Sequence, residues 1–199
     1  MPVVTISDPK TDLIAYLQEA RDAVLWKLDG LSEYDVRRPL TPTGTNLLGL
    51  VKHLAAMEFG YFGDTFGRPP SDEPPWAADG IQEVEPNVDM WATATESREY
   101  ITGEYRRSWA HADATFGDLD IEAVGRVPWW SPEHAEVSLH QILTHMIAET
   151  HRHAGQADIV RELIDGAAGL RAENSNLPGQ DAAWWAAYHD RVEQAAREA

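Results

Sequence analysis

The residues best suited to chemistry lie in one ten-residue stretch, "ETHRHAGQAD", at positions 149–158. Glu149 and His153 are four residues apart, so on a helix they lie on one face, one turn apart. His151 points about 160° away from His153. A pair of ligands at positions i and i+4 is a recurring arrangement for binding a transition metal, because the two side chains converge. The stretch therefore predicts a metal site that uses Glu149 and His153.

A third ligand is needed, because a catalytic zinc ion has three protein ligands and one open position. His53 borders an apolar stripe, three residues after Leu50 and four before Met57. That stripe has to face the core of a helical protein. We therefore predict a metal site formed by His53, Glu149 and His153, with zinc as the expected metal and nickel or iron as alternatives.

Two further polar residues share the face of Glu149 and His153. His145 lies one turn before Glu149, and Gln156 lies nearly one turn after His153. A metal-bound imidazole generally donates its second ring N–H to a partner, and we expect Gln156 and His145 to fill that role. The remaining histidines are expected at the surface or at the boundary of the core: His111, His134, His140, His151 and His189.

Other roles remain open for these side chains. A histidine beside an apolar stripe, such as His53, is often a boundary residue of the core, and Glu149 with His153 could be a solvated polar pair. If a metal is bound, water or oxygen could occupy its open position, so hydrolysis and iron-dependent oxygen chemistry are candidates. A non-catalytic metal-binding bundle is the remaining alternative. Tyr61 and His145 are the candidates for a general acid.

Five helical segments have to position these residues. Apolar side chains recur at steps of three and four within residues 10–31, 46–64, 88–120, 136–166 and 182–199. Gly30 and Gly166 are the expected ends of the first and fourth helices. No alternating strand pattern persists anywhere. We therefore predict an all-α protein with a single domain over residues 1–199: a four-helix bundle plus a C-terminal helix.

Two connections interrupt the helical pattern. The first, from Gly67 to Pro86, contains five prolines and is expected to be a long link without regular structure, with a solvated acidic part from Ser71 to Glu85. Three tryptophans lie in the connections and could form the wall of a pocket: Trp76, Trp129 and Trp130. The others belong to the helical segments and are expected in the core: Trp26, Trp91, Trp109, Trp184 and Trp185.

The overall composition restricts partners and location. The 199 residues carry a formal charge of −17, which repels nucleic acid and anionic membranes. No long apolar run or signal peptide is evident, so we expect a cytoplasmic protein. The chain has no cysteine, which excludes disulfides, iron–sulfur clusters and a cysteine nucleophile. Any thiol chemistry would need a thiol from outside the protein.

Three stretches together resemble the DinB superfamily of four-helix bundle proteins. They are "TNLLGLVKHLAAMEFGYFGDTFG" at 45–67, "SLHQILTHMIAETHRHAGQADIVRELIDG" at 138–166 and "WWAAYHDRVE" at 184–193. The resemblance covers roughly residues 10–195 and implies up-down-down-up topology with a long crossover between helices 2 and 3. It also implies a divalent metal on His53, Glu149 and His153, a ligand set similar to that of the mycothiol-dependent maleylpyruvate isomerases.

The resemblance also implies an activity. Single-domain members of this superfamily include thiol S-transferases that use mycothiol or bacillithiol. A metal favours the thiolate over the neutral thiol, whose ordinary pKa is near 8.5. The chain is thus expected to be a metal-dependent transferase in which a mycothiol-like thiol attacks a small electrophile such as an epoxide, an alkyl halide or a quinone. A homodimer is expected by the same resemblance.

Overall fold

The computed structural model describes residues 8–78 and 80–199. The chain divides into two compact units, one ending at Ala168 and the other comprising Gly169–Ala199. The first unit contains all the residues predicted to bind metal, and the second contains helix α7 (Ala182–Glu198). A single domain over residues 1–199 stays a prediction.

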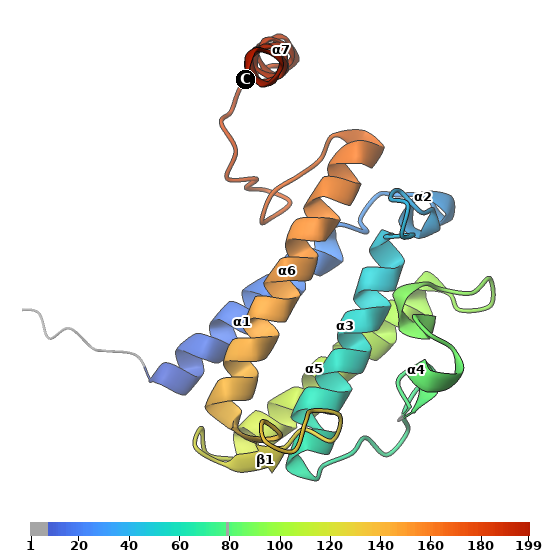
Figure 1. Ribbon diagram of the computed structural model, residues 1–199, viewed down its shortest axis with the longest axis vertical. Coiled ribbons are helices and arrows are strands. Elements are labelled where there is room, and N and C mark those ends of the chain that lie inside the picture. Colours follow the sequence, from blue (N-terminus) through green and yellow to red (C-terminus); the bar gives the residue numbers. More distant parts are fainter. Residues whose placement is uncertain (1–7, 79) are drawn as a thin grey trace, which may run out of the picture. The chain divides into compact units, whose positions relative to one another are not determined.

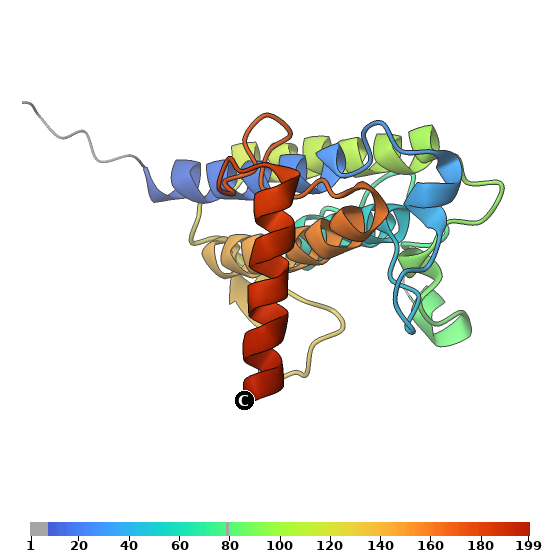
Figure 2. The same cartoon turned by 90° about the horizontal axis from the view of Figure 1, so that it is seen from above.

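The first unit is a four-helix bundle. Its long helices are α1 (Pro9–Trp26), α3 (Leu47–Phe62), α5 (Arg98–Asp118) and α6 (Leu139–Asp165). In Figure 1, α1 and α6 run upward, whereas α3 and α5 run downward. Figure 2 shows two layers, with α1 beside α5 in one and α3 beside α6 in the other. The predicted all-α bundle and its up-down-down-up order are confirmed.

Each long helix begins at a polar side chain that accepts a hydrogen bond from a backbone N–H of the first turn. Such caps satisfy donors that have no partner within the helix. The capping residues are Asp8, Asn46, Ser97 and Ser138. Gly166 ends α6 with φ of +81°, a conformation that glycine adopts without steric cost. The predicted end of this helix is therefore confirmed.

The third long helix begins later than the sequence pattern predicts. Residues 88–97 form the short 3-10 helix η2 (Val88–Met90) and a turn, and α5 starts only at Arg98. The Glu96 side chain accepts a hydrogen bond from the backbone N–H of Thr93 at 2.7 Å. Local bonds of this kind compete with the helical pattern. The predicted helical span of 88–120 is therefore wrong over its first ten residues.

A small hairpin interrupts the all-helical pattern. Strands β1 (Val124–Arg126) and β2 (Glu136–Ser138) pair in antiparallel register. Strands of three residues are too short to show an alternating pattern in the sequence. A Cβ on Gly125 would lie 2.6 Å from the Thr65 carbonyl oxygen, so glycine allows the hairpin to lie directly on the 3-10 helix η1 (Asp64–Phe66), which follows α3. The loop between the strands is consequently held at both ends.

The crossover between α3 and α5 lies tightly against α3. It contains the short helix α4 (Ile81–Val84) before η2, so it does not wholly lack regular structure. The buried Lys52 Nζ donates to the carbonyl oxygens of Val88 and Trp91. A Cβ on Gly49 would lie 1.9 Å from the Met90 carbonyl oxygen. Only glycine at position 49 permits this contact, which places η2 beside the N-terminal half of α3.

The tryptophans are not all where the sequence placed them. Trp76 is 4% exposed and its ring packs against Lys52, so it belongs to the core instead of lining a pocket. Trp91 is 46% exposed, contrary to its expected burial. Trp184 and Trp185 are half-buried in the second unit, where they contact each other and the Tyr188 ring.

Two short helices complete the described elements: α2 (Glu33–Arg37) follows α1, and η1 follows α3. Within residues 8–78 and 80–199, none of the helices has both the length and the apolar character of a bilayer-crossing segment.

Candidate metal centre

Two helices bring the three predicted ligands together. His53 comes from α3, and Glu149 and His153 come from α6. One donor atom from each residue lies within 4.8 Å of the other two. Glu149 Oε1 lies 2.9 Å from Nε2 of His153 and 3.6 Å from Nε2 of His53. The fold thus places two imidazole nitrogens and a carboxylate oxygen around one point.

Each histidine is oriented through its other ring nitrogen. Nδ1 of His53 lies 2.7 Å from Oδ2 of Asp89, and Nδ1 of His153 lies 2.7 Å from Oε1 of Gln156. These contacts fix the ring planes and leave both Nε2 atoms facing Glu149. The expected contact between Gln156 and His153 is present.

Asp89 is the residue that the sequence analysis missed. It is 4% exposed and lies on η2, 36 positions away from His53. Gln82 donates a hydrogen bond to its second oxygen, Oδ1, at 2.7 Å. Only the folded crossover brings Asp89 to His53, and no local spacing in the sequence signals this contact.

His145 does not orient a ligand, because Asp89 and Gln156 already occupy both Nδ1 atoms. Its ring instead packs against Tyr61 and Trp130, with centroid separations of 4.8 and 5.4 Å. The prediction that His145 orients a ligand imidazole is therefore wrong. The other histidines lie at the surface or the core boundary as expected, and His111 hydrogen-bonds the carbonyl oxygen of Arg68.

The electrostatics of the cluster favour a positive charge at its centre. Burial by itself lowers the pKa of His53, but hydrogen bonds with Asp89 and Glu149 outweigh it and raise that pKa from 6.5 to about 9. The hydrogen bond with His53 lowers the pKa of Glu149 to about 2, against the effect of burial. Burial and the nearby His53 charge lower the pKa of His153. At neutral pH, His53 carries one positive charge, whereas Glu149 and Asp89 each carry a negative charge.

The polar contacts of His153 explain why a metal cation fits this site better than the protons of the histidines alone. Its Nδ1 faces the amide oxygen of Gln156 and its Nε2 faces the Glu149 carboxylate, so both partners are acceptors. A neutral imidazole has only one N–H, and the lowered pKa of His153 disfavours a second. A cation beside Nε2 would remove this conflict, because it accepts the lone pairs of both the nitrogen and the carboxylate.

The donor set and its accessibility fit a divalent metal. Two imidazoles and one carboxylate form a set used by catalytic zinc and by non-haem iron. The side chains of His53 and Glu149 are 16% and 27% exposed, so the point between them is reachable from solvent. Three protein donors leave room for an exogenous ligand.

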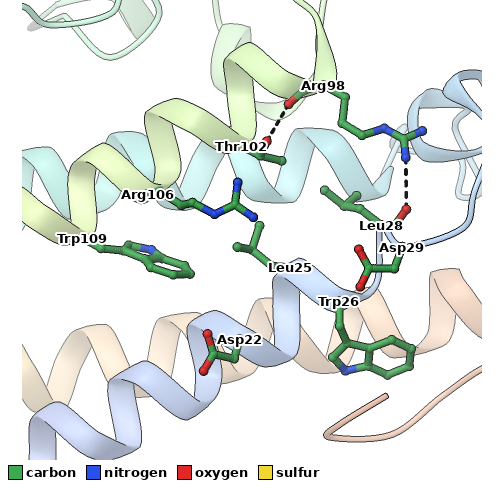
Figure 3. Close-up of a pocket in the computed structure, with 9 residues that line it drawn as sticks. All are labelled: Asp22, Leu25, Trp26, Leu28, Asp29, Arg98, Thr102, Arg106 and Trp109. Atoms are coloured by element: carbon green, nitrogen blue, oxygen red, sulfur yellow. Dashed lines mark hydrogen bonds between the residues drawn. The ribbon is translucent and has the colours of Figure 1, made fainter. Parts of the chain in front are cut away.

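A separate cavity lies on the other side of the bundle. Its volume is about 460 Å³, and it is formed by α1, the turn that follows it, and α5. Figure 3 shows Trp109 at one end, Trp26 at the other and the Arg106 guanidinium between them. Its lining residues are Asp22, Leu25, Trp26, Leu28, Asp29, Arg98, Thr102, Arg106 and Trp109. None of them belongs to the candidate metal centre.

Comparison with known families identifies the chain. A sequence model of the mycothiol S-transferases matches residues 12–166. The chain belongs to the mycothiol S-transferase family. This DinB-like family confirms the resemblance seen in the sequence, and the match spans both helices that carry His53, Glu149 and His153. A comparison with curated proteins gave no significant match.

A solved structure supports the fold. The crystal structure of a conserved protein from Enterococcus faecalis superposes with a TM-score of 0.56 at 14% sequence identity. The superposition covers 81% of this chain and 100% of that one. At this identity the similarity concerns the bundle architecture alone.

Proposed function

We propose that this protein is a divalent-metal-dependent thiol S-transferase that joins a low-molecular-weight thiol of the mycothiol type to a small electrophile. Family membership supports thiol transfer as the reaction class. The single observation that carries the proposal is the convergence of His53, Glu149 and His153. Zinc as the metal and mycothiol as the thiol are parts of the proposal.

The chain's own residues prepare the site for a thiol. When bound there, a divalent metal supplies positive charge that favours the thiolate over the thiol. Asp89 and Gln156 hold the two imidazoles in place, so the donor atoms need little rearrangement. Since the chain lacks cysteine, the nucleophilic sulfur has to come from the co-substrate.

The bond changes are those of a nucleophilic displacement. A sulfur lone pair forms the new C–S bond, the bond from that carbon to its leaving atom breaks, and the leaving atom takes the electron pair. The thiol proton passes to solvent. With an epoxide, the leaving oxygen stays attached to the product and needs a proton.

Tyr61 is proposed to donate that proton, with His145 as the neighbouring alternative. Trp130 Nε1 donates a hydrogen bond to the Tyr61 hydroxyl at 3.2 Å. This bond uses an oxygen lone pair and therefore leaves the phenol proton available. On α6, His145 lies one turn from Glu149, about 6 Å along the helix. Tyr61 contacts the His145 ring and so lies at this same level.

The decisive experiment combines metal analysis with a thiol panel. Protein purified without an affinity tag is expected to contain one divalent metal per chain. Zinc-loaded protein is expected to consume mycothiol with a generic electrophile, and chelation is expected to abolish the reaction. Ester and amide substrates without thiol serve as the test for hydrolysis.

Two outcomes would contradict the proposal. Thiol turnover that survives replacement of both His53 and His153 by Ala would remove the metal-dependent mechanism. Hydrolysis of esters without any thiol reaction would assign the site to a hydrolase instead. His151→Ala is the matched control, because this residue lies on the same helix but faces away from the ligands, and it is expected to leave activity unchanged.

A further inference from the structure

Four aromatic rings gather beyond the ligands along α3 and α6, about two turns from His53 and one turn from Glu149. They belong to Tyr61 on α3, His145 on α6, and Trp129 and Trp130 in the loop between β1 and β2. Tyr61 lies at the centre, with ring centroids 5.0 Å from Trp129, 6.0 Å from Trp130 and 4.8 Å from His145. We call these four residues the aromatic shelf.

The shelf is continuous with the candidate metal centre. The helices α3 and α6 are antiparallel neighbours (Figure 1). Tyr61, which follows His53 on α3, therefore lies on the same side of the ligands as His145, which precedes Glu149 on α6. Met57 lies on α3 one turn after His53 and one turn before Tyr61. It is half-buried and packs on the core, so it makes an apolar connection from the ligands to the shelf.

The loop that carries the two tryptophans is rigidly placed. Val127 is fully buried, and its N–H donates to the Ala135 carbonyl oxygen across the loop at 2.8 Å. Trp130 is half-buried against the core and is tied to the Tyr61 hydroxyl. The position of the shelf is therefore set before any ligand arrives.

Trp129 gives the shelf its free surface. A Cβ on Gly60 would lie 2.7 Å from the Trp129 ring, so the indole rests directly on the backbone of α3. Even so, 48% of Trp129 is exposed. A large apolar side chain held rigidly and half in water is a surface that a planar or apolar ligand would cover favourably.

We propose that the aromatic shelf binds the electrophile, and that it selects substrates with an aromatic ring next to the reacting carbon. This inference rests on the proposed thiol transfer for its catalytic consequence, but it makes a binding claim that can be tested alone. The ring of the substrate stacks on Trp129, and its reacting carbon then extends toward the Glu149 side of the candidate metal centre. The loop of Trp129 and Trp130 thus determines the substrate class.

A pair of epoxides tests the selection. Styrene oxide and propylene oxide carry the same reactive ring and differ in having phenyl or methyl beside it. With zinc-loaded protein and mycothiol, Trp129→Ala is expected to lower kcat/KM for styrene oxide about tenfold, chiefly through KM. The value for propylene oxide is expected to change less than about twofold. Trp129→Phe should restore most of the styrene oxide activity, because it retains a ring.

Tyr16→Ala is the matched control. Tyr16 is an aromatic residue of α1 that is 59% exposed, and its removal should affect neither epoxide. Equal losses for both epoxides in Trp129→Ala would overturn the proposal, because they would show a general effect on the site. Unchanged kinetics for styrene oxide would overturn it as well.

A binding measurement keeps the proposal independent of turnover. The probes are 2-phenylethanol and 1-propanol, which cannot react with a thiol. We expect 2-phenylethanol, and not 1-propanol, to shift the indole N–H resonances of Trp129 and Trp130 in the NMR spectrum of the zinc-loaded protein. Shifts confined to other tryptophans, or no shift at all, would refute the shelf. Shifts at these two residues in a protein without thiol transfer would instead refute the proposed function alone.

Discussion

Two polar clusters inside the same bundle balance their charges in different ways. In one, Arg21 of α1 donates hydrogen bonds of 2.8 and 2.6 Å to the two oxygens of Glu58 on α3. Both of these side chains are completely buried. In the other, His53, Glu149 and His153 direct their donor atoms at a common point, and two of the three are partly exposed.

The difference separates a structural cluster from a binding site. The guanidinium and the carboxylate satisfy each other, so the Arg21–Glu58 pair needs nothing from outside. In the candidate metal centre, His153 faces two acceptors, the Gln156 amide oxygen and the Glu149 carboxylate, but a neutral imidazole has a proton for only one of them. The cluster therefore has a lone pair left for an added cation. We expect the two clusters to respond in opposite ways to mutation: the first through the stability of the fold, and the second through binding.

The largest expected effect is on folding. Glu58→Ala leaves the Arg21 charge buried without its main partner, and we expect a loss of about 3–5 kcal/mol in the free energy of unfolding. Urea denaturation followed by circular dichroism measures this loss. The double variant Arg21→Met with Glu58→Leu should recover most of the stability, because apolar residues can replace a buried ion pair. A loss below about 1 kcal/mol in Glu58→Ala would contradict the structural role.

The next effect is on metal binding. Glu149→Ala removes one of three donors, and we expect the zinc affinity to fall by more than about 100-fold. The free energy of unfolding of the metal-free protein should fall less than in Glu58→Ala, because Glu149 is partly exposed and solvent screens its ion pairs. Titration calorimetry with zinc measures the affinity. Stoichiometric, tight zinc binding that is unaffected by this change would show that the ligands are other residues.

A smaller effect is expected at the residue that orients His53. Asp89→Asn keeps the shape of the side chain but removes its charge, and we expect the zinc affinity to fall about 10–100-fold. Asp72→Asn is the matched control, because Asp72 is an exposed acid in the same crossover. If both variants bind zinc like the unmodified protein, the crossover is not part of the metal centre.

A graded effect is expected from pH, and it is smallest between neighbouring pH values. Below a pH of about 9, His53 of the metal-free protein carries a proton that a metal has to displace. The apparent zinc affinity should therefore rise about tenfold per pH unit from neutrality and level off near the raised pKa. Titrations in zinc-buffered solutions measure the slope. A flat profile between pH 7 and about 8.5 would contradict the protonated state of His53.

The same pKa has a consequence for the stability of the metal-free protein. The folded-state pKa of His53 lies above its ordinary value of 6.5, so its contribution to stability is fully present below about pH 6.5. That contribution is lost as the pH rises through about 9. In Asp89→Asn the pKa of His53 should fall. The pH at which its contribution to stability is lost should then be lower, and so should the pH at which the zinc affinity levels off.

The helices that carry the ligands were predictable, but their surroundings were not. The spacing of Glu149 and His153 fixes their common face on any helix. His53 borders an apolar stripe, which indicates that its side chain points toward the core. In contrast, residues 88–97 have a helical apolar pattern, yet hydrogen bonds among Thr93, Glu96 and Lys52 keep them out of α5. The competing bond to Lys52 comes from a distant part of the chain.

By itself, the sequence determined the all-α class, the three candidate ligands and the fact that any thiol chemistry would need an external thiol. These follow from periodicity, from the geometry of a single helix and from the absence of cysteine, all of which are local or compositional properties. The tertiary structure alone decided that Asp89 orients His53, that the loop of Trp129 and Trp130 lies on Gly60, and that His145 joins the shelf. Such contacts join segments far apart in the chain, and they form only when α3, α6 and their connections pack together.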